Sequence, residues 1–155
     1  MDEAIALRPI GVVEGGRRDS VDDHWEDVES TIVLDDRFSP QALLGLEQFS
    51  HLDVVYLFHL VDPRSIEGGA RHPRGNPSWP LVGIFAQRAK GRPNRLGVST
   101  CRIVGIDGRR IAVRDLDAVD GSPVLDLKPH MTGMGPRGAV VEPQWAVELM
   151  AHYWR

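Results

Sequence analysis

An Asp-Gly pair between two alternating runs constrains the fold of this chain most. Residues 97–106 and 109–114 alternate apolar and polar side chains on either side of Asp107-Gly108. Such a pair suits the tight turn of a β-hairpin, because both residue types tolerate the positive φ angles that short hairpin loops require. The two runs are therefore predicted to be neighbouring antiparallel strands.

Five other short runs predict further strands. Each is rich in β-branched or aromatic residues, and turn-forming residues lie between them. The predicted strands are residues 7–13, 30–35, 53–60, 81–85 and 124–127. About seven strands with little helix between them favour a mainly β fold, a single-sheet antiparallel β-barrel.

Two segments predict short helices. Ser39 suits an N-cap and Pro40 the first helical position, where its missing N–H has no helical partner to lose. Residues 143–154 repeat apolar side chains at helical spacing and predict a C-terminal helix. The length suits one domain, so residues 1–155 are predicted to form a single barrel domain.

The sequence indicates a cytoplasmic location. No apolar run approaches the ~20 residues that span a membrane, and the acidic start Met-Asp-Glu-Ala does not resemble a signal peptide. Cys101 is the single cysteine and cannot form an internal disulfide, which fits a reducing compartment. It lies in an apolar alternating run, so a core position is predicted.

Charge is distributed unevenly along the chain. The net charge of -4 argues against a protein that binds nucleic acid by charge alone. Residues 1–62 carry 4 basic and 14 acidic side chains, whereas residues 63–114, the basic segment, carry 11 basic and 2 acidic ones. The basic segment is a candidate phosphate-binding surface. It is equally consistent with pairing to the acidic third, within the fold or across a dimer.

The basic side chains are concentrated between two glycines. Residues 83–97 hold four of them and no acidic one: Arg88, Lys90, Arg92 and Arg95. The Gly, Pro and Asn residues beside them allow close approach of the backbone to a ligand, and arginine suits a carboxylate or a phosphate. The alternative is a solvated basic loop.

A second polar block covers residues 117–130. Asp126 lies between Leu125 and Leu127, so its side chain points to the opposite face of the predicted strand, where Lys128 also lies. Either the two form an ion pair within the strand, or the carboxylate binds a ligand or acts as a base.

The histidines do not form a metal-binding motif. His51 and His59 lie beside apolar runs, and the chain has no second cysteine and no His-Glu-x-x-His. No metal is expected, and a hydrogen-bonded structural role is the simplest interpretation of both.

Seven sequence blocks occur in the order of a known family. They are Ile10-Gly11-Val12, residues 45–52, Phe58-His59, residues 83–88, residues 92–97, Leu116-Asp117 and residues 120–129. In these blocks the chain resembles the TrmO family, also called the TsaA-like or YaeB-like family. The resemblance implies a single-sheet β-barrel that is usually a homodimer.

The resemblance also implies an enzyme. Members of the family methylate N6 of threonylcarbamoyl-adenosine beside the anticodon, at position 37 of tRNA, with S-adenosylmethionine as the methyl donor. The expected cofactor is therefore S-adenosylmethionine, without a metal, and the expected partner is tRNA.

The cofactor positions of the family correspond to residues of four blocks. They are His59, Leu60, Arg88, Val98, Arg114, Asp115, Leu116 and Asp117. The carboxylates are expected to bind ribose hydroxyls or the amino group, and the arginine is expected to bind the methionine carboxylate. Candidates to contact the substrate or RNA are Arg92, Asn94, Arg95 and Lys128. Candidates for the base that takes the proton of the amine are Asp126 and His130.

The chain departs from the family pattern in three places. Members usually carry Pro-x-Gln after the first strand, where this chain has the acidic residues 15–26. His130 stands in place of a tyrosine, and residues 143–154 stand where some members have a larger domain. The acidic residues in place of Pro-x-Gln favour an alternative, because added negative charge repels RNA: a barrel that binds S-adenosylmethionine but acts on another substrate, or serves as a non-catalytic binding module.

Overall fold

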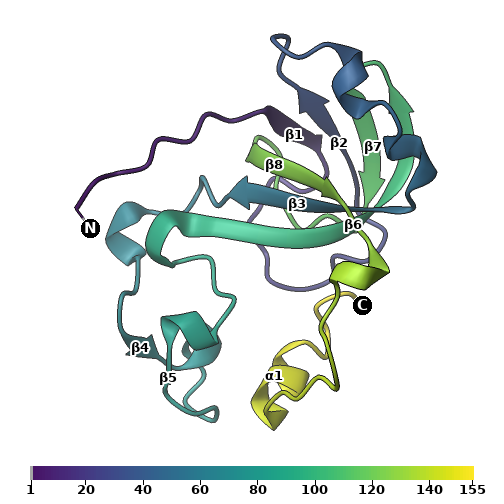
Figure 1. Cartoon of the computed structure of the whole chain (residues 1–155). Coiled ribbons are helices and arrows are strands. Elements are labelled where there is room, and N and C mark those ends of the chain that lie inside the picture. The colour runs from purple at the N-terminus through teal and green to yellow at the C-terminus, as the bar shows by residue number, and fades with distance from the viewer. Residues whose placement is uncertain (1) are drawn as a thin grey trace.

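A closed antiparallel β-barrel forms the body of the protein (Figure 1). The computed structural model describes residues 2–155. Around the barrel the strands follow the order β1-β2-β7-β6-β3-β8, and β8 pairs with β1 to close it. The strands are β1 (Gly11–Gly15), β2 (Glu29–Leu34), β3 (His51–Leu57), β6 (Leu96–Asp107), β7 (Arg110–Arg114) and β8 (Pro123–Pro129). The predicted barrel is confirmed, with six strands where about seven were expected.

The remaining predicted strand forms a small sheet outside the barrel. Of residues 81–85, only Val82–Gly83 (β5) is extended and paired, and its partner is Ala70–Arg71 (β4). The chain then enters a 3-10 helix, Ile84–Ala86, in which Ile84 is buried. A short apolar run does not distinguish a barrel strand from a loop that buries one side chain.

The hairpin predicted from the Asp-Gly pair is present. Asp107 pairs with Arg110, so the two loop residues are Gly108 and Arg109. Gly108 has a φ of 59°, which glycine adopts without a steric penalty. The alternation of the flanking runs and this turn therefore set the register of β6 against β7.

The barrel interior is filled by every second side chain of the strands. In β3 the inward side chains are Leu52, Val54 and Tyr56. The other strands contribute Val13, Ile32, Ile111, Val113 and Val124, none more than 1% exposed. Cys101 belongs to the same core, as predicted, and burial raises the pKa of its thiol to about 12.

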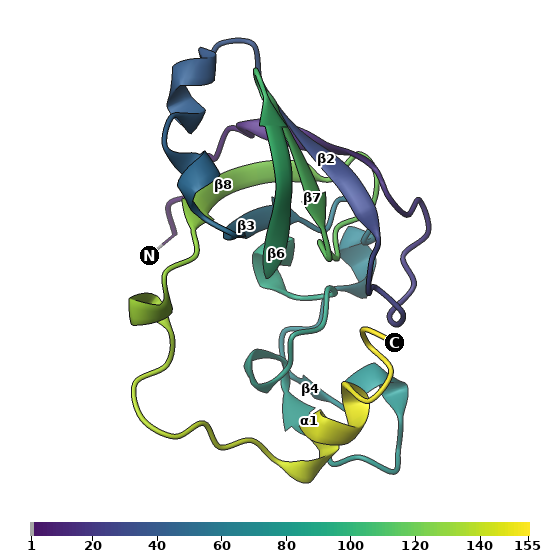
Figure 2. The ribbon, with the colours of Figure 1, turned by 90° about the vertical axis from the view of Figure 1, so that its right-hand side faces the viewer.

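Three long connections leave the barrel at one end. Because neighbouring strands are antiparallel, the connections after β1, β3 and β7 emerge side by side. They are residues 16–28 (the acidic loop), residues 58–95 and residues 115–122. The acidic loop, most of the basic segment and the Asp117 stretch therefore meet at this end, and Figure 2 shows the β4–β5 sheet and α1 beyond it.

The helices are short. The 3-10 helices are Pro40–Leu43, Leu46–Gln48, Pro63–Ser65, Pro73–Gly75, Ile84–Ala86, Pro93–Arg95 and Thr132–Met134. Ser39 Oγ accepts a hydrogen bond from Gln41 N at 3.1 Å, which confirms the predicted helix start. No helix within residues 2–155 is long and apolar enough to cross a membrane.

The single α-helix, α1 (Gln144–Leu149), is shorter than the predicted residues 143–154. The carbonyl groups of residues 152–154 accept hydrogen bonds from the backbone N–H groups of residues 24–26. The end of the chain therefore leaves the helical path and lies along the acidic loop.

Gly97 allows two aromatic rings to enter the open end of the barrel. It lies opposite Tyr56 in the pairing of β6 with β3. A Cβ atom at position 97 would lie 2.7 Å from Tyr56 Cζ and 2.8 Å from Phe58 Cζ. Any side chain there would displace at least one ring.

We predict that Gly97→Ala lowers the free energy of unfolding by about 1–3 kcal/mol, the usual effect of overpacking a core. Gly105→Ala is the matched control, because it lies in the same strand and its Cβ would meet nothing within 4 Å. Urea unfolding of the two variants measures the difference. Equal losses for both would contradict the steric role of Gly97.

Candidate functional site

The Asp117 carboxylate is the centre of a polar cluster at the loop end of the barrel. Its Oδ1 accepts a hydrogen bond from Tyr56 Oη at 3.0 Å, and its Oδ2 accepts one from Tyr153 Oη. Tyr56 belongs to β3, whereas Tyr153 follows α1. Asp117, Tyr56 and Tyr153 are called the tyrosine cluster below.

The phenols of the tyrosine cluster act as donors at neutral pH. Burial raises the pKa of Tyr56 and of Tyr153, and the negative charge of Asp117 raises both further. The nearby positive charge of Arg88 acts in the opposite direction on both pKa values. Arg88 therefore lies close enough to the cluster to interact with it electrostatically.

Arg88 is held beside β6. Its Nη2 donates a hydrogen bond to the carbonyl oxygen of Val98 at 2.7 Å. The arginine side chain is exposed and has further N–H groups for a ligand. Arg88, Val98 and Asp117 come from three separate sequence blocks, and the fold gathers them at one end of the barrel.

His59 lies against the Asp-Gly-Ser-Pro turn that precedes β8. A Cβ atom on Gly121 would lie 3.4 Å from its Nε2. Its Nδ1 is buried and has no hydrogen-bond partner within the described residues. An unpaired buried ring nitrogen is costly unless a ligand or water satisfies it. Leu60, the next predicted position, is 56% exposed.

The other predicted residues of the Asp117 stretch point elsewhere. Arg114 pairs with Glu29 across β7 and β2 at 2.5 Å. Asp115 accepts a hydrogen bond from the backbone of the acidic loop, and Leu116 is fully buried in the core. Of the four predicted positions from Arg114 to Asp117, only Asp117 has its side chain bonded to Tyr56 and Tyr153.

Asp126 and Lys128 lie on the outer wall of the barrel. They are opposite Val55 and Asp53 of β3, whose side chains alternate with the inward-facing Tyr56. Lys128 Nζ is 2.9 Å from Asp126 Oδ2, so the ion pair anticipated from their spacing is present. The barrel wall separates this pair from the tyrosine cluster.

His130 belongs to a hydrogen-bonded chain on the same wall. Its Nδ1 lies 3.0 Å from Asp53 Oδ1, which also accepts a hydrogen bond from Thr100 Oγ1 at 2.6 Å. Within residues 2–155, no three His, Cys, Asp or Glu side chains group together as a metal ion requires.

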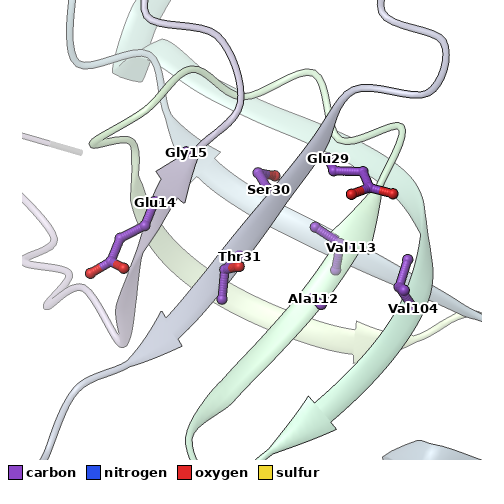
Figure 3. Close-up of a pocket in the computed structure, with 8 residues that line it drawn as sticks. All are labelled: Glu14, Gly15, Glu29, Ser30, Thr31, Val104, Ala112 and Val113. Atoms are coloured by element: carbon purple, nitrogen blue, oxygen red, sulfur yellow. The ribbon is translucent and has the colours of Figure 1, made fainter.

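Two shallow hollows mark the surface of the barrel. One, of about 220 Å³, is lined by Glu26, His51, Thr100, Arg102, Asp115 and Trp154. It combines a predicted cofactor residue, Asp115, with the ring of Trp154. The other, of about 200 Å³, lies over β1, β2 and β7 (Figure 3) and is lined by Glu14, Gly15, Glu29, Ser30, Thr31, Val104, Ala112 and Val113. None of the predicted site residues lines this second hollow.

Arg92 and Arg95 brace the backbone of the basic segment. Arg92 Nη1 donates to the carbonyl of Gln87 at 2.6 Å, and Arg95 Nη1 donates to that of Val61 at 3.1 Å. Asn94 lies between them with a φ of 64° and is exposed. Each arginine has further N–H groups, so bracing and contact with a phosphate are compatible.

Part of the basic segment pairs with the acidic loop. Arg74 Nη2 is 3.0 Å from Asp23 Oδ1, and Lys90 Nζ is 3.5 Å from Asp22 Oδ1. Pairing within the fold therefore accounts for these two cations. Arg88 forms no ion pair among the described residues, and its side chain is held by the Val98 carbonyl.

The two tyrosines are the site residues that sequence reasoning missed. Tyr56 had a weak signal, because an aromatic residue in an interior strand is usually core. Tyr153 had none, because the contact joins it to a residue 36 positions earlier through an irregular segment. Only the three-dimensional structure brings them to Asp117.

Comparison with known proteins identifies the barrel. The family model for the N-terminal domain of tRNA-methyltransferase O (TrmO) matches residues 21–134. The chain belongs to the TrmO family. The matched range contains Tyr56, Arg88, Val98 and Asp117. Tyr153 lies outside this range, in the segment that follows it.

Relatives of the TrmO-family barrel differ in length. A probable S-adenosyl-L-methionine-binding protein of Pyrococcus abyssi is 34% identical over 139 residues, which cover 82% of this chain and 68% of that protein. The human tRNA (adenine(37)-N6)-methyltransferase is 33% identical over 102 residues, 66% of this chain and 23% of that protein. The crystal structure of TrmO from Pseudomonas aeruginosa matches with a TM-score of 0.74 and 28% identity, over 90% of this chain and 61% of that one. The chain thus spans less than two thirds of the length of the human protein and of the Pseudomonas aeruginosa TrmO.

The tyrosine cluster predicts a loss of stability in alkali. A phenol whose pKa is raised by folding stabilises the protein fully below the pKa of the unfolded chain, near 10, and loses this contribution as pH rises further. Above pH ~10, Tyr56 should lower the free energy of unfolding by up to about 1.4 kcal/mol per pH unit. Urea unfolding between pH 8 and 11 should show a shallower decline for Tyr56→Phe. Parallel curves for the variant and the unmodified chain would contradict this.

Proposed function

We propose that the chain is an S-adenosylmethionine-dependent methyltransferase that acts on N6 of threonylcarbamoyl-adenosine at position 37 of tRNA. The observation that carries the proposal is the meeting of Arg88, Val98 and Asp117 at the open end of a TrmO-family barrel. The name of the human relative, tRNA (adenine(37)-N6)-methyltransferase, supports the reaction. A homodimer remains part of the proposal through the family resemblance.

The residues of this end of the barrel suit S-adenosylmethionine chemically. The cofactor has a carboxylate, an amino group, a ribose diol and a cationic sulfonium. Arg88 would hold the carboxylate, and Asp117 would accept hydrogen bonds from the amino group or the diol. His59 Nδ1, buried without a partner among the described residues, supplies one further polar contact.

The cofactor supplies an electrophilic methyl group when bound. The chain has to hold the acceptor amine in line with that group, exclude water and receive the proton that the amine releases. The open end of the barrel, bounded by the acidic loop, the basic segment and residues 152–154, provides walls for this purpose.

Of the two candidates for the proton acceptor, only His130 keeps an unpaired acceptor atom, but both lie on the outer wall of the barrel, away from the tyrosine cluster. Asp53 accepts a hydrogen bond from His130 Nδ1–H in the neutral tautomer, which leaves Nε2 with its lone pair. Thr100, which also binds Asp53, lines the same hollow as Asp115 and Trp154. Asp126, in contrast, is paired with Lys128.

A specific observation favours a second candidate function, a barrel that binds the cofactor but not tRNA. The acidic loop stands where family members usually carry Pro-x-Gln, and it neutralises Arg74 and Lys90. The remaining negative charge of the loop opposes a phosphate backbone. The Pyrococcus abyssi relative is itself named only as a binding protein.

We expect Asp117→Asn to weaken S-adenosylmethionine binding about tenfold or more, equivalent to ~1.4 kcal/mol, because a charge-assisted hydrogen bond is lost. Calorimetric titration of the purified chain measures the dissociation constant. Asp36→Asn is the matched control, since it removes an exposed carboxylate outside the described site. A second assay measures methyl transfer from S-adenosylmethionine to threonylcarbamoylated tRNA by the unmodified chain. No binding by the unmodified chain would overturn both candidate functions, and binding without transfer would favour the second.

The tRNA interaction is tested separately by its salt dependence. We expect the double variant Arg92→Ala, Arg95→Ala to bind tRNA about tenfold more weakly at low salt, with a smaller difference at high salt, because contacts to phosphates release counterions. Arg64→Ala is the control, because its side chain is 91% exposed and pairs with the neighbouring Asp62. Equal affinities of the double variant and the unmodified chain across the salt series would remove these arginines from the tRNA surface.

A further inference from the structure

The Asp117 carboxylate is bound on both oxygens by side chains of the protein. Tyr56 Oη lies 3.0 Å from Oδ1 and 3.2 Å from the main-chain oxygen of the same residue, and Tyr153 Oη binds Oδ2. A carboxylate that accepts one hydrogen bond on each oxygen cannot rotate freely. It still has roughly two lone-pair directions for a ligand, because an ionised carboxylate offers about four.

Tyr153 is delivered to this position by a segment that is anchored to the rest of the protein at two places. The N–H groups of residues 24–26 donate to the carbonyls of residues 152–154 at 3.0, 2.9 and 2.7 Å. Trp79 Nε1 donates to Glu148 Oε2 at 2.8 Å. Figure 2 shows this segment returning along the molecule from the end of β8 to the loop end of the barrel.

The acidic loop that receives the segment is itself ordered by a buried aromatic ring. Trp25 is 3% exposed, and the guanidinium of Arg17 lies 4.5 Å from its ring centre. The loop and the segment after α1 therefore form one structure, whose inner surface presents the hydroxyl of Tyr153 to Asp117.

The protonation of both phenols agrees with this arrangement. Since burial and the charge of Asp117 keep Tyr56 and Tyr153 protonated, each hydroxyl donates its hydrogen atom to the carboxylate. The positive charge of Arg88 acts on both phenols and lowers the pKa of each. The carboxylate is thus oriented by two donors and partly desolvated before a ligand arrives, which is the condition for tight binding by preorganised groups.

We propose that Tyr153 is a positioning residue of the cofactor site: together with Tyr56 it fixes the Asp117 carboxylate, so that a segment outside the matched family domain completes the site. This inference rests on the proposed function, in which Asp117 binds S-adenosylmethionine. The segment after α1 would therefore supply a hydrogen bond to Asp117 that the barrel alone does not provide.

The test compares Tyr153→Phe with the unmodified full chain in calorimetric titrations with S-adenosylmethionine. The substitution retains the ring and removes only the hydroxyl, and the dissociation constant should rise about five- to tenfold, since one hydrogen bond to a charged group is lost. Asp36→Asn is the control, because it removes an exposed carboxylate that makes no contact with the tyrosine cluster or with the segment after α1. Its dissociation constant should stay within twofold of that of the unmodified chain.

A double-mutant cycle separates positioning from general stabilisation. If Tyr153 acts through the carboxylate, Tyr153→Phe should change the dissociation constant by less than twofold in an Asp117→Asn background. Methyl transfer should show the same effect as a raised KM for S-adenosylmethionine with kcat little changed.

Three outcomes contradict the inference. First, an unchanged dissociation constant for Tyr153→Phe would remove the positioning role of Tyr153. Second, the role would also be removed if Tyr153→Phe raised the dissociation constant by the same factor in the unmodified chain and in the Asp117→Asn background. Tighter binding by Tyr153→Phe would make the segment a competitor of the cofactor instead. Failure of the unmodified chain to bind S-adenosylmethionine overturns the proposed function together with this inference, and is therefore distinguishable from the other three results.

Discussion

The two-residue alternation of β3 is the constraint on which the placement of the polar groups depends. The strand pairs with β6 on one side and β8 on the other, so its register is fixed by two neighbours. This places Tyr56 inside the open end of the barrel and Asp53 on the outer wall. A shift of one residue would exchange the two faces. It would remove the phenol from Asp117 and bury a carboxylate in an apolar interior. Gly97 makes the observed register possible, because any larger residue would occupy the space of the ring.

Much of the barrel could be predicted because its strands carry local signals. The Asp-Gly pair and the alternation around it indicated the β6–β7 hairpin, and residues 30–35 and 124–127 lie within a residue or two of the observed strands. Residues 81–85 did not join the barrel: only Val82–Gly83 is extended, and the chain then turns into a 3-10 helix that buries Ile84. The helix after β8 was predicted too long, because residues 152–154 pair with the backbone of the acidic loop instead of continuing the helix.

The candidate site was predictable only where it lies in sequence blocks. Arg88, Val98 and Asp117 were predicted from such blocks, and the fold brings these three residues to one end of the barrel. Tyr153 was not, because contacts between segments far apart in sequence leave no local pattern. The basic segment shows the same limit. Composition could not distinguish cations that pair with the acidic loop, such as Arg74, from one that is held by a backbone carbonyl of β6 and forms no ion pair among the described residues, such as Arg88.

The path of the chain after β8 has a consequence for the order of folding. The barrel closes through pairs that end at Pro129, whereas the contacts of residues 152–154 with residues 24–26 span well over one hundred positions in sequence. Contacts of such high sequence separation form late, because they carry a large loop-closure cost until the rest of the chain is ordered. The pairing of Gly11 with Val124 that closes the barrel spans a similar separation. Closure of the barrel and the fixing of the Asp117 carboxylate by Tyr153 are therefore both expected as late steps of folding.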